Sequence, residues 1–506
     1  MVVRRKKSTK TTTQTSSSFP CTIEEFKETI KTALHHNPDL HLQDFTIANR
    51  RVLITYFTYQ INKDQLNSMI LRTLLNSQKP WDHNRIMNEI PIGTGENQSD
   101  SNKIAEILCK GHCCLYVEGD EEAVTFLIPE LKSRQVGAAE NESLVFGPQI
   151  AFNESLVTNL NIVRWGIDSP DLKMEKLTVG KMISTEVRVI YLDNLANKEN
   201  VNTIRQRIED LEVDDAMDAN VLGQLIEDKS SSIFPQLLTT ELPDRFLYAI
   251  KKGKVGIMVD KSPNVLIGPT SLFSFFESTE DIYMRWNMGT FIRILRLFAM
   301  MISITLTPAY VAALTYHYEV VPSSLLVSLG KSRANVPFPP VLEALLLELL
   351  IELLREAGAR LPTKVGQTMG IVGGVVIGQA AVKAGFTSNI LIIVIALSAL
   401  ASFTAPSYLM GTAIRVIRFP MILLSGLWGL LGIMYGLSFL IIHLLKLTSL
   451  GRPFLVPLYP LTLVDLRSSI FRLPWPWASR RPYSNEPQEI KRFSRAKALE
   501  KKDIDE

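Results

Sequence analysis

Apolar residues form two kinds of pattern along this chain, and the pattern changes near Thr290. Before Thr290, short apolar runs alternate with charged segments at the spacings of soluble helices and strands. After Thr290, the apolar runs become long enough to cross a hydrocarbon core of roughly 30 Å. The pattern therefore predicts an α/β soluble N-terminal region of two subdomains. An all-α transmembrane domain of about four spans plus one amphipathic helix follows it.

The first α/β subdomain is predicted over residues 21–135, after a basic Ser/Thr-rich tail, residues 1–20, that we expect to be disordered. Apolar residues recur at helical spacing in Thr22–His36. Val52–Tyr59 is β-branched and aromatic, as strands are. Cys113–Val117 is a short apolar run typical of a buried strand.

The second α/β subdomain is predicted over residues 144–285, after a polar linker. Val187–Leu192 and Lys254–Val259 have the composition of strands, and Lys198–Leu211 has the apolar spacing of a helix. Ser262-Pro-Asn264 predicts a hairpin turn, because proline and asparagine favour turn geometry. Both subdomains are expected in the cytosol, because the N-terminus lacks the apolar run of a signal peptide.

The transmembrane domain is predicted over residues 290–450, and a basic cytosolic tail over 451–506. The four spans are expected at about 295–316, 365–381, 390–405 and 419–445. Arg293 and Arg296 precede the first span, which places its N-terminal end in the cytoplasm by the positive-inside rule. With four crossings, the arginine-rich tail also faces the cytoplasm.

Glycines recur every four residues in the second span. The repeat consists of Gly366, Gly370, Gly374 and Gly378, with Gln367 and Gln379 near its ends. In a soluble helix each glycine would cost roughly 1 kcal/mol relative to alanine. In a membrane the same spacing lets another helix backbone approach closely. The repeat therefore predicts tight helix packing, and it is also compatible with the lining of a pore or ligand path.

Residues 341–356 form an apolar helix that carries a stripe of carboxylates. Its Val, Leu and Ile residues would gain about 3–6 kcal/mol on insertion, whereas two central carboxylates would lose about 5–7 kcal/mol. The helix is also only ~24 Å long. We therefore expect that it does not cross facing lipid. It is either a surface-lying amphipathic helix or a carboxylate-lined ion path formed by Glu343, Glu348, Glu352 and Glu356.

Composition and motifs exclude several classes of function. Lys+Arg 54 against Asp+Glu 51 gives a net charge of +3, too small for a general nucleic-acid binder. The chain has no phosphate-binding loop, nucleophile elbow, zinc-protease motif or dinucleotide fingerprint, so we expect neither an enzyme nor a cofactor. Cys109, Cys113 and Cys114 lie near His112, but no second ligand pair stands at zinc spacing, so no metal site is predicted.

Several ordered strings resemble the A-subunit family of bacterial spore germinant receptors, the GerA family. The clearest are Pro337-Phe-Pro-Pro, Glu343-Ala-Leu-Leu-Leu-Glu-Leu-Leu, Ile371-Val-Gly-Gly-Val-Val-Ile-Gly, Phe152-Asn-Glu-Ser-Leu and Ser169-Pro-Asp-Leu. The sequence departs from the family pattern at Phe146 and Gln149, where charged residues are expected. Any anion contact at that loop is therefore not carried over to this chain.

The resemblance implies a function that composition does not. Such proteins lie in the inner membrane of the dormant spore, in contact with membrane lipid. They act with a transporter-like B subunit and a lipoprotein C subunit to sense nutrients and trigger germination. The A subunit is thought to form a homo-oligomer and a nutrient-gated ion channel. A non-conducting signalling scaffold and a small-molecule transporter are the alternatives.

Overall fold

The computed structural model describes residues 19–130, 139, 142, 146–361 and 378–495. The predicted disordered tail lies almost entirely outside the described residues. The chain divides into two compact units. The first unit joins Met1–Ser133 to Leu160–Glu175, and the second joins Arg134–Asn159 to Lys176–Glu506.

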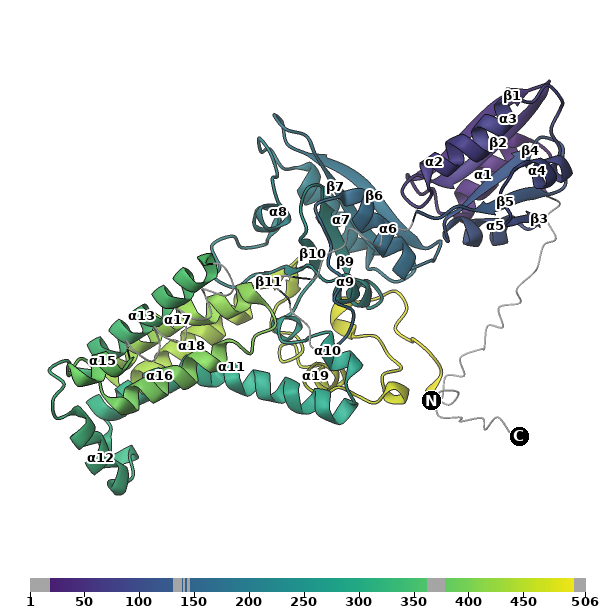
Figure 1. Cartoon of the computed structure of the whole chain (residues 1–506). Helices are drawn as coiled ribbons and strands as arrows, with labels where there is room; N and C mark the ends of the chain where they lie inside the picture. Colours follow the sequence, from purple (N-terminus) through teal and green to yellow (C-terminus); the bar gives the residue numbers. More distant parts are fainter. Residues whose placement is uncertain (1–18, 131–138, 140–141, 143–145, 362–377, 496–506) are drawn as a thin grey trace, which may run out of the picture. The chain divides into compact units, whose positions relative to one another are not determined.

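The first unit is built on a five-stranded antiparallel sheet in the order β1-β2-β4-β5-β3. Its strands are β1 (Leu40–Ile47), β2 (Arg50–Phe57), β3 (Gly95–Gln98), β4 (His112–Val117) and β5 (Ala123–Leu127). Its helical elements are α1 (Ile23–Ala33), α2 (Lys63–Gln65), η1 (Leu66–Leu71), α3 (Arg72–Leu75), α4 (His83–Glu89) and α5 (Ser101–Leu108). They cover both faces of the sheet (Figure 1).

Alternating residues of β4 explain this layered arrangement. Cys113 and Leu115 face the core that η1, α3 and α4 cover. The next residue, Tyr116, points to the opposite face and stacks on Phe26 of α1, with ring centroids 4.4 Å apart. Because successive side chains of a strand alternate between faces, an apolar run covered by helices on both sides is buried throughout.

Residues Leu160–Glu175 belong to the first unit, although the sequence pattern assigned them to the second subdomain. Asn161, in α6 (Leu156–Gly166), donates hydrogen bonds to the carbonyls of Tyr59 and Glu130 at 2.9 and 2.8 Å. Arg164 is fully buried and donates to the carbonyl of Leu172 at 3.1 Å. These contacts join segments far apart in the sequence, so hydrophobic periodicity gave no sign of them.

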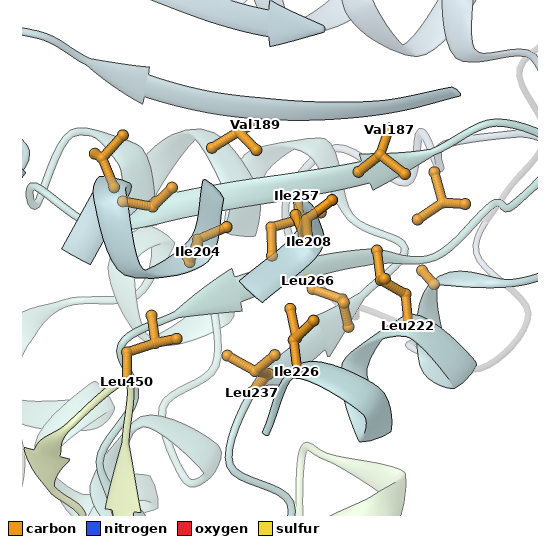
Figure 2. Close-up of a cluster of buried hydrophobic side chains, with 14 of the residues drawn as sticks. Val187, Val189, Ile204, Ile208, Leu222, Ile226, Leu237, Ile257, Leu266 and Leu450 are labelled. Atoms are coloured by element: carbon orange, nitrogen blue, oxygen red, sulfur yellow. The ribbon is translucent and has the colours of Figure 1, made fainter. Parts of the chain in front are cut away.

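The α/β part of the second unit contains another five-stranded sheet, in the order β6-β7-β9-β10-β8. Its strands are β6 (Leu172–Val179), β7 (Thr185–Leu192), β8 (Leu238–Thr240), β9 (Val255–Val259) and β10 (Val265–Gly268). The helices are α7 (Lys198–Glu209), α8 (Ala219–Ile226) and α9 (Pro243–Ile250). Figure 2 shows Ile204 and Ile208 of α7 facing Val187, Val189 and Ile257 of the sheet.

Helices dominate the rest of the second unit (Figure 1). They are α10 (Glu280–Tyr283), α11 (Trp286–Thr315), α12 (Ser323–Arg333), α13 (Pro340–Arg360), α15 (Gly378–Lys383), α16 (Asn389–Ser402), α17 (Tyr408–Trp428) and α18 (Leu430–Lys446). In the described residues, α11 and α17 are long and apolar enough to cross a membrane, whereas α16 and α18 are shorter apolar helices. Val311, Ala344, Leu391, Ile395 and Ile422 form a core shared by α11, α13, α16 and α17.

The helices of the bundle differ from the predicted spans at Gly429. The stretch expected as one span over 419–445 is two helices, because Gly429 between α17 and α18 has a positive φ of 63°. An L-residue rarely adopts this backbone conformation, and glycine does so freely. Most of the stretch predicted as the second span, 365–381, lies outside the described residues, which include only its last residues, at the start of α15.

The C-terminal segment returns to the α/β part of the second unit. Leu450 joins the core of the second sheet (Figure 2). The Ser449 hydroxyl donates to the Gln236 carbonyl at 2.6 Å. Further along, α19 (Leu463–Ile470) packs against α11 and η3 (Leu272–Phe275). The start of α11 is therefore held between the α/β part and the C-terminal segment.

Candidate functional site

The inner face of α13 carries acidic side chains into the helical bundle. Glu343 is 1 % exposed and Glu348 is 3 % exposed, although α13 is otherwise rich in leucine. Burying a carboxylate is costly unless it is paired and hydrogen-bonded. The partners of these two residues therefore decide how the bundle is held together.

Glu348 sits at a junction of four helices. It pairs with Arg418 of α17 at 2.7 Å, and Thr307 of α11 donates a hydrogen bond to its other oxygen at 3.1 Å. Arg418 also donates to the Ser303 hydroxyl of α11 at 2.6 Å and to the Ser398 carbonyl of α16 at 3.3 Å. This network satisfies both charges inside the bundle, which a charge facing lipid does not achieve.

Glu343 makes a second junction, one turn and a half along α13 towards its N-terminus. It accepts hydrogen bonds from the Thr387 hydroxyl at 3.0 Å and from the Ser388 backbone N–H at 2.7 Å, and it pairs with Arg333 at 3.2 Å. Ser388 is the N-cap of α16 and accepts from the N–H of Leu391. A carboxylate at a helix N-terminus is favoured by the helix dipole, so Glu343 fixes the start of α16.

Glu352 and Glu356 lie progressively closer to solvent. Glu352 pairs with Arg415 of α17 at 3.2 Å and with Arg355 at 3.6 Å. Glu356 is exposed and pairs with Arg360 on the same helix. We call Glu343, Glu348 and Glu352, together with their partners Arg333, Arg418 and Arg415, the polar seam.

The polar seam gives α13 a place that the sequence analysis did not foresee. The sequence pattern predicted either a surface-lying amphipathic helix or a carboxylate-lined ion path for residues 341–356. In the structure, two carboxylates of the stripe face neighbouring helices instead. Arg415 and Arg418, which a four-span count puts outside, are the buried partners of this stripe. The sequence did contain a sign of this pairing, because Arg415 and Arg418 lie three residues apart in an apolar run.

The glycine repeat lies mostly outside the described residues. Gly366, Gln367, Gly370 and Gly374 are not described. Gly378 and Gln379 begin α15, where Gln379 is exposed and Gly378 is partly buried. Tight helix packing and pore lining by the glycine repeat both stay predictions.

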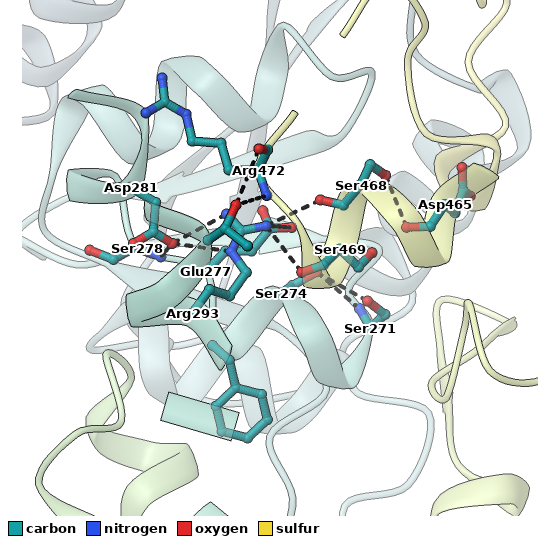
Figure 3. A network of polar contacts seen from close by, with 12 residues as sticks. Ser271, Ser274, Glu277, Ser278, Asp281, Arg293, Asp465, Ser468, Ser469 and Arg472 are labelled. Atoms are coloured by element: carbon teal, nitrogen blue, oxygen red, sulfur yellow. Dashed lines mark hydrogen bonds and ion pairs between the residues drawn. The ribbon is translucent and has the colours of Figure 1, made fainter. Parts of the chain in front are cut away.

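A second polar cluster lies where the α/β part meets α11 (Figure 3). Asp281 is fully buried and pairs with Arg293 at 3.2 Å and with Arg296 at 2.9 Å. Arg293 also donates to the carbonyls of Ser468 and Ser469 in α19 at 3.1 and 3.0 Å. One arginine of α11 therefore ties that helix to both the α/β part and the C-terminal segment.

Glu277 carries the other carboxylate of this cluster. Burial alone would raise the pKa of Glu277, but Lys252 and Arg293 outweigh burial and lower it to about 2. The carboxylate pairs with Lys252 at 3.0 Å. Nearby Lys254 has no such partner among the described residues, and burial, reinforced by the like charge of Lys252, lowers its pKa to about 7.

Cys109, Cys113 and Cys114 belong to the structural core of the first unit, whereas Cys21 is exposed. Cys113 and Cys114 are buried in β4, and burial raises the pKa of both thiols. Among the described residues, no group of three or more His, Cys, Asp or Glu side chains is arranged to hold a metal ion.

Comparison with known proteins places these features in context. Residues 28–484 match the family described as "Bacillus/Clostridium GerA spore germination protein". The chain is similar to "Spore germination protein GerQA" of Bacillus cereus, with 43 % identity over 94 % of this chain and 96 % of that protein. It is 35 % identical to "Spore germination protein A1" of Bacillus subtilis (strain 168), over 92 % of this chain and 96 % of that protein.

Two further relatives add to this comparison. "Uncharacterized membrane protein YfkQ" of Bacillus subtilis (strain 168) is 33 % identical over 88 % of this chain and 87 % of its own length. Among solved structures, the N-terminal domain of the A subunit of the Bacillus megaterium spore germinant receptor GerK3 is 25 % identical. That match has a TM-score of 0.39 and covers 50 % of this chain and 96 % of the other.

Proposed function

This chain belongs to the GerA family of spore germination proteins, and on that premise we propose that it acts as an oligomeric, nutrient-gated ion channel. It is the membrane-bound A subunit of a germinant receptor. In this proposal it lies in the spore inner membrane with its N-terminal region in the cytoplasm. A transporter-like B subunit and a lipoprotein C subunit complete the receptor that responds to nutrients.

The observation that carries the proposal is the polar seam. Ionisable side chains inside a membrane domain are costly, and they commonly mark ion or substrate pathways. Here Glu343 and Glu348 are buried in a helix bundle that also has an apolar core. Both carboxylates belong to the candidate ion path that the sequence pattern proposed, together with Glu352 and Glu356.

The pairing of the seam suggests how conduction is prevented at rest. Arg418 neutralises Glu348, and Arg333 neutralises Glu343, so neither carboxylate is free to attract a cation in this conformation. A movement of α13 away from α17 would separate Glu348 from Arg418 and expose both to water. We propose that nutrient binding in the receptor complex drives this movement.

The outer face of α13 supports an oligomer. Leu342, Leu346, Leu349 and Leu353 are 42–61 % exposed on this face. Such a stripe of leucines on a single helix needs an apolar neighbour, which a second copy of the chain or lipid provides. In our proposal copies meet along α13, and the glycine repeat from Gly366 to Gly378 packs in the same region.

The test replaces Glu348 with glutamine in spores that carry the receptor. We expect E348Q to change potassium efflux after nutrient addition, because the variant removes the charge that Arg418 holds. E121Q is the matched control, since it makes the same charge change at an exposed site of the first unit, outside the candidate ion path. Unaltered efflux from E348Q spores, at normal receptor levels on an immunoblot, contradicts a conducting role for the seam.

A non-conducting signalling scaffold is the alternative. Its support is the large α/β region, which offers two sheets for binding partners. Receptor complexes reconstituted in planar bilayers distinguish the two readings. Current on nutrient addition supports the channel, whereas silence with all three subunits present supports the scaffold. Uptake of labelled nutrient without current would instead support a small-molecule transporter.

A further inference from the structure

A large basic cavity lies beside the start of α11. Its volume is about 820 Å³, and it is lined by the end of the α/β part, by Arg293, and by the C-terminal segment from Val464 to Arg495. Ten basic side chains line it, but only two acidic ones, Glu277 and Asp465. We call this space the basic cavity. Its charge balance is far from that of the whole chain, which is nearly neutral.

Both carboxylates of the basic cavity already have partners. Glu277 pairs with Lys252 at 3.0 Å. Asp465 is 1 % exposed and accepts hydrogen bonds from the backbone N–H groups of Tyr483 and Ser484 at 3.0 and 2.7 Å. Neither carboxylate is therefore available to the remaining cations.

Several of these cations have no carboxylate within ion-pair distance in the part of the chain that the structure describes, among them Lys254, Arg467 and Arg495. Lys254 is only 8 % exposed, and its ammonium group donates to the Ser274 hydroxyl at 3.1 Å. The guanidinium groups of Arg467 and Arg495 both lie over the ring of Trp477, at 5.3 and 4.6 Å from its centroid. A buried lysine without a counter-ion is costly, and an anion in the cavity removes that cost.

In the helices beside the basic cavity, charged residues are buried and apolar residues are exposed. At the start of α11, Arg293 is buried, whereas Trp286 and Phe291 are 52 and 67 % exposed. In α19, Asp465 is buried and Leu463 is 71 % exposed. A surface helix in water shows the opposite arrangement, with charges outward. The outward-facing apolar residues therefore indicate contact with lipid at the level of the cavity.

We propose that the basic cavity binds the phosphate-bearing headgroup of an acidic phospholipid. A phosphate offers several acceptor oxygens, which the Arg467 and Arg495 guanidinium groups and the Lys254 ammonium group match as donors. Trp477, half-exposed beside these arginines, suits the boundary between headgroups and acyl chains. The exposed apolar faces of α11 and α19 favour a lipid over free phosphate, because the acyl chains extend along them.

Bound lipid would also connect the parts that meet at Arg293. The cavity is lined by the α/β part, by α11 and by the C-terminal segment, so one headgroup would touch all three. The lipid would thus stabilise the arrangement in which α11 is held at its base. This goes beyond ion conduction and does not depend on it.

The experiment measures lipid binding to the purified full chain in neutral detergent by native mass spectrometry. The probes are short-chain phosphatidylglycerol, short-chain phosphatidylcholine and inorganic phosphate. The R467Q/R495Q variant is compared with K181Q/K198Q, which removes two exposed basic charges of the α/β part. We expect the first variant to lose about fivefold in phosphatidylglycerol affinity for each cation removed, and the second to bind as the unaltered chain does.

K254M provides a second, independent arm, with its fold checked by circular dichroism. It should weaken phosphatidylglycerol binding and leave phosphatidylcholine binding unchanged. Equal binding by R467Q/R495Q and K181Q/K198Q overturns the proposal, and so does equal affinity for the two lipids. Inorganic phosphate that binds as tightly as phosphatidylglycerol overturns the lipid assignment and makes the cavity a phosphate site.

Discussion

The polar seam and the basic cavity differ in how their charged side chains are paired. In the seam, the three carboxylates of α13 each pair with an arginine of the same chain. In the cavity, ten basic side chains face two carboxylates that are already engaged. The carboxylates of the seam are therefore paired within one chain, whereas the cavity keeps an excess of positive charge.

This difference implies that the seam and the cavity act on the helices in different ways: the seam through contacts within the chain, and the cavity through an anion from outside. Breaking the seam requires helices to move apart, because no water or ligand competes for Glu348 and Arg418 while both are buried. Filling or emptying the cavity needs no such movement, because it opens to the surroundings of α11. Conformational change is thus expected to start at the seam, and adjustment to the membrane at the cavity.

The largest expected effect comes from breaking the buried ion pair of the seam. R418Q leaves Glu348 buried without a counter-charge and should lower the free energy of unfolding by about 3–5 kcal/mol. E348Q should cost a similar amount, and the double variant E348Q/R418Q should cost less than the sum of the two. Thermal unfolding of the full chain in detergent measures all three.

The exposed pair Glu356–Arg360 is the matched control for this cycle. Exposed pairs of this spacing on a helix contribute about 0.3–0.5 kcal/mol. E356Q and R360Q should therefore be nearly neutral. Strictly additive losses in the free energy of unfolding for E348Q and R418Q would contradict a direct coupling between the two residues. The seam would then no longer differ from the cavity in having its charges paired within the chain.

The next largest expected effect is a pH dependence of the free energy of unfolding that arises from Lys254. Burial, with the like charge of Lys252, lowers its pKa from 10.5 to about 7 in the folded chain. Between these values the unfolded chain binds more protons, so this group makes stability rise with pH. Each pH unit adds at most about 1.4 kcal/mol, so we expect about 2 kcal/mol between roughly pH 7 and 9.

Chemical or thermal unfolding across this pH range measures the slope. K254M should abolish the rise, whereas K181M, at an exposed lysine, should preserve it. Acidic phospholipid in the cavity should reduce the slope in the unaltered chain, because the bound anion keeps Lys254 protonated. A slope that persists in K254M assigns the pH dependence to another group.

Local pattern predicted much of the molecule. The β-branched run at Val187–Leu192 forms β7, and the turn at Ser262–Asn264 connects the antiparallel strands β9 and β10. Family membership confirms the resemblance found in the ordered strings between Phe152 and Gly378. These features depend on residues close in sequence, where periodicity and turn chemistry act directly.

Long-range pairing explains what the sequence did not reveal. The acidic stripe of α13 predicted a surface-lying helix or a carboxylate-lined ion path, because its two central carboxylates were assigned their full insertion cost. Arg418 lies 70 residues after Glu348 in the chain, and only the fold brings them within 2.7 Å. The fourth span was predicted to begin at residue 419, whereas α17 begins at Tyr408.

The smallest expected effect concerns Ser388, a neutral residue that contacts Glu343 of the seam. Ser388 caps α16 by accepting from the N–H of Leu391 at 3.2 Å, while its own N–H binds Glu343. S388A removes the cap but keeps the backbone N–H, so it should cost about 1 kcal/mol in thermal unfolding. S323A, at an exposed serine at the start of α12, is the control and should be neutral. A cost for S388A equal to that of R418Q would mean that hydroxyl groups, not charges, hold the seam together.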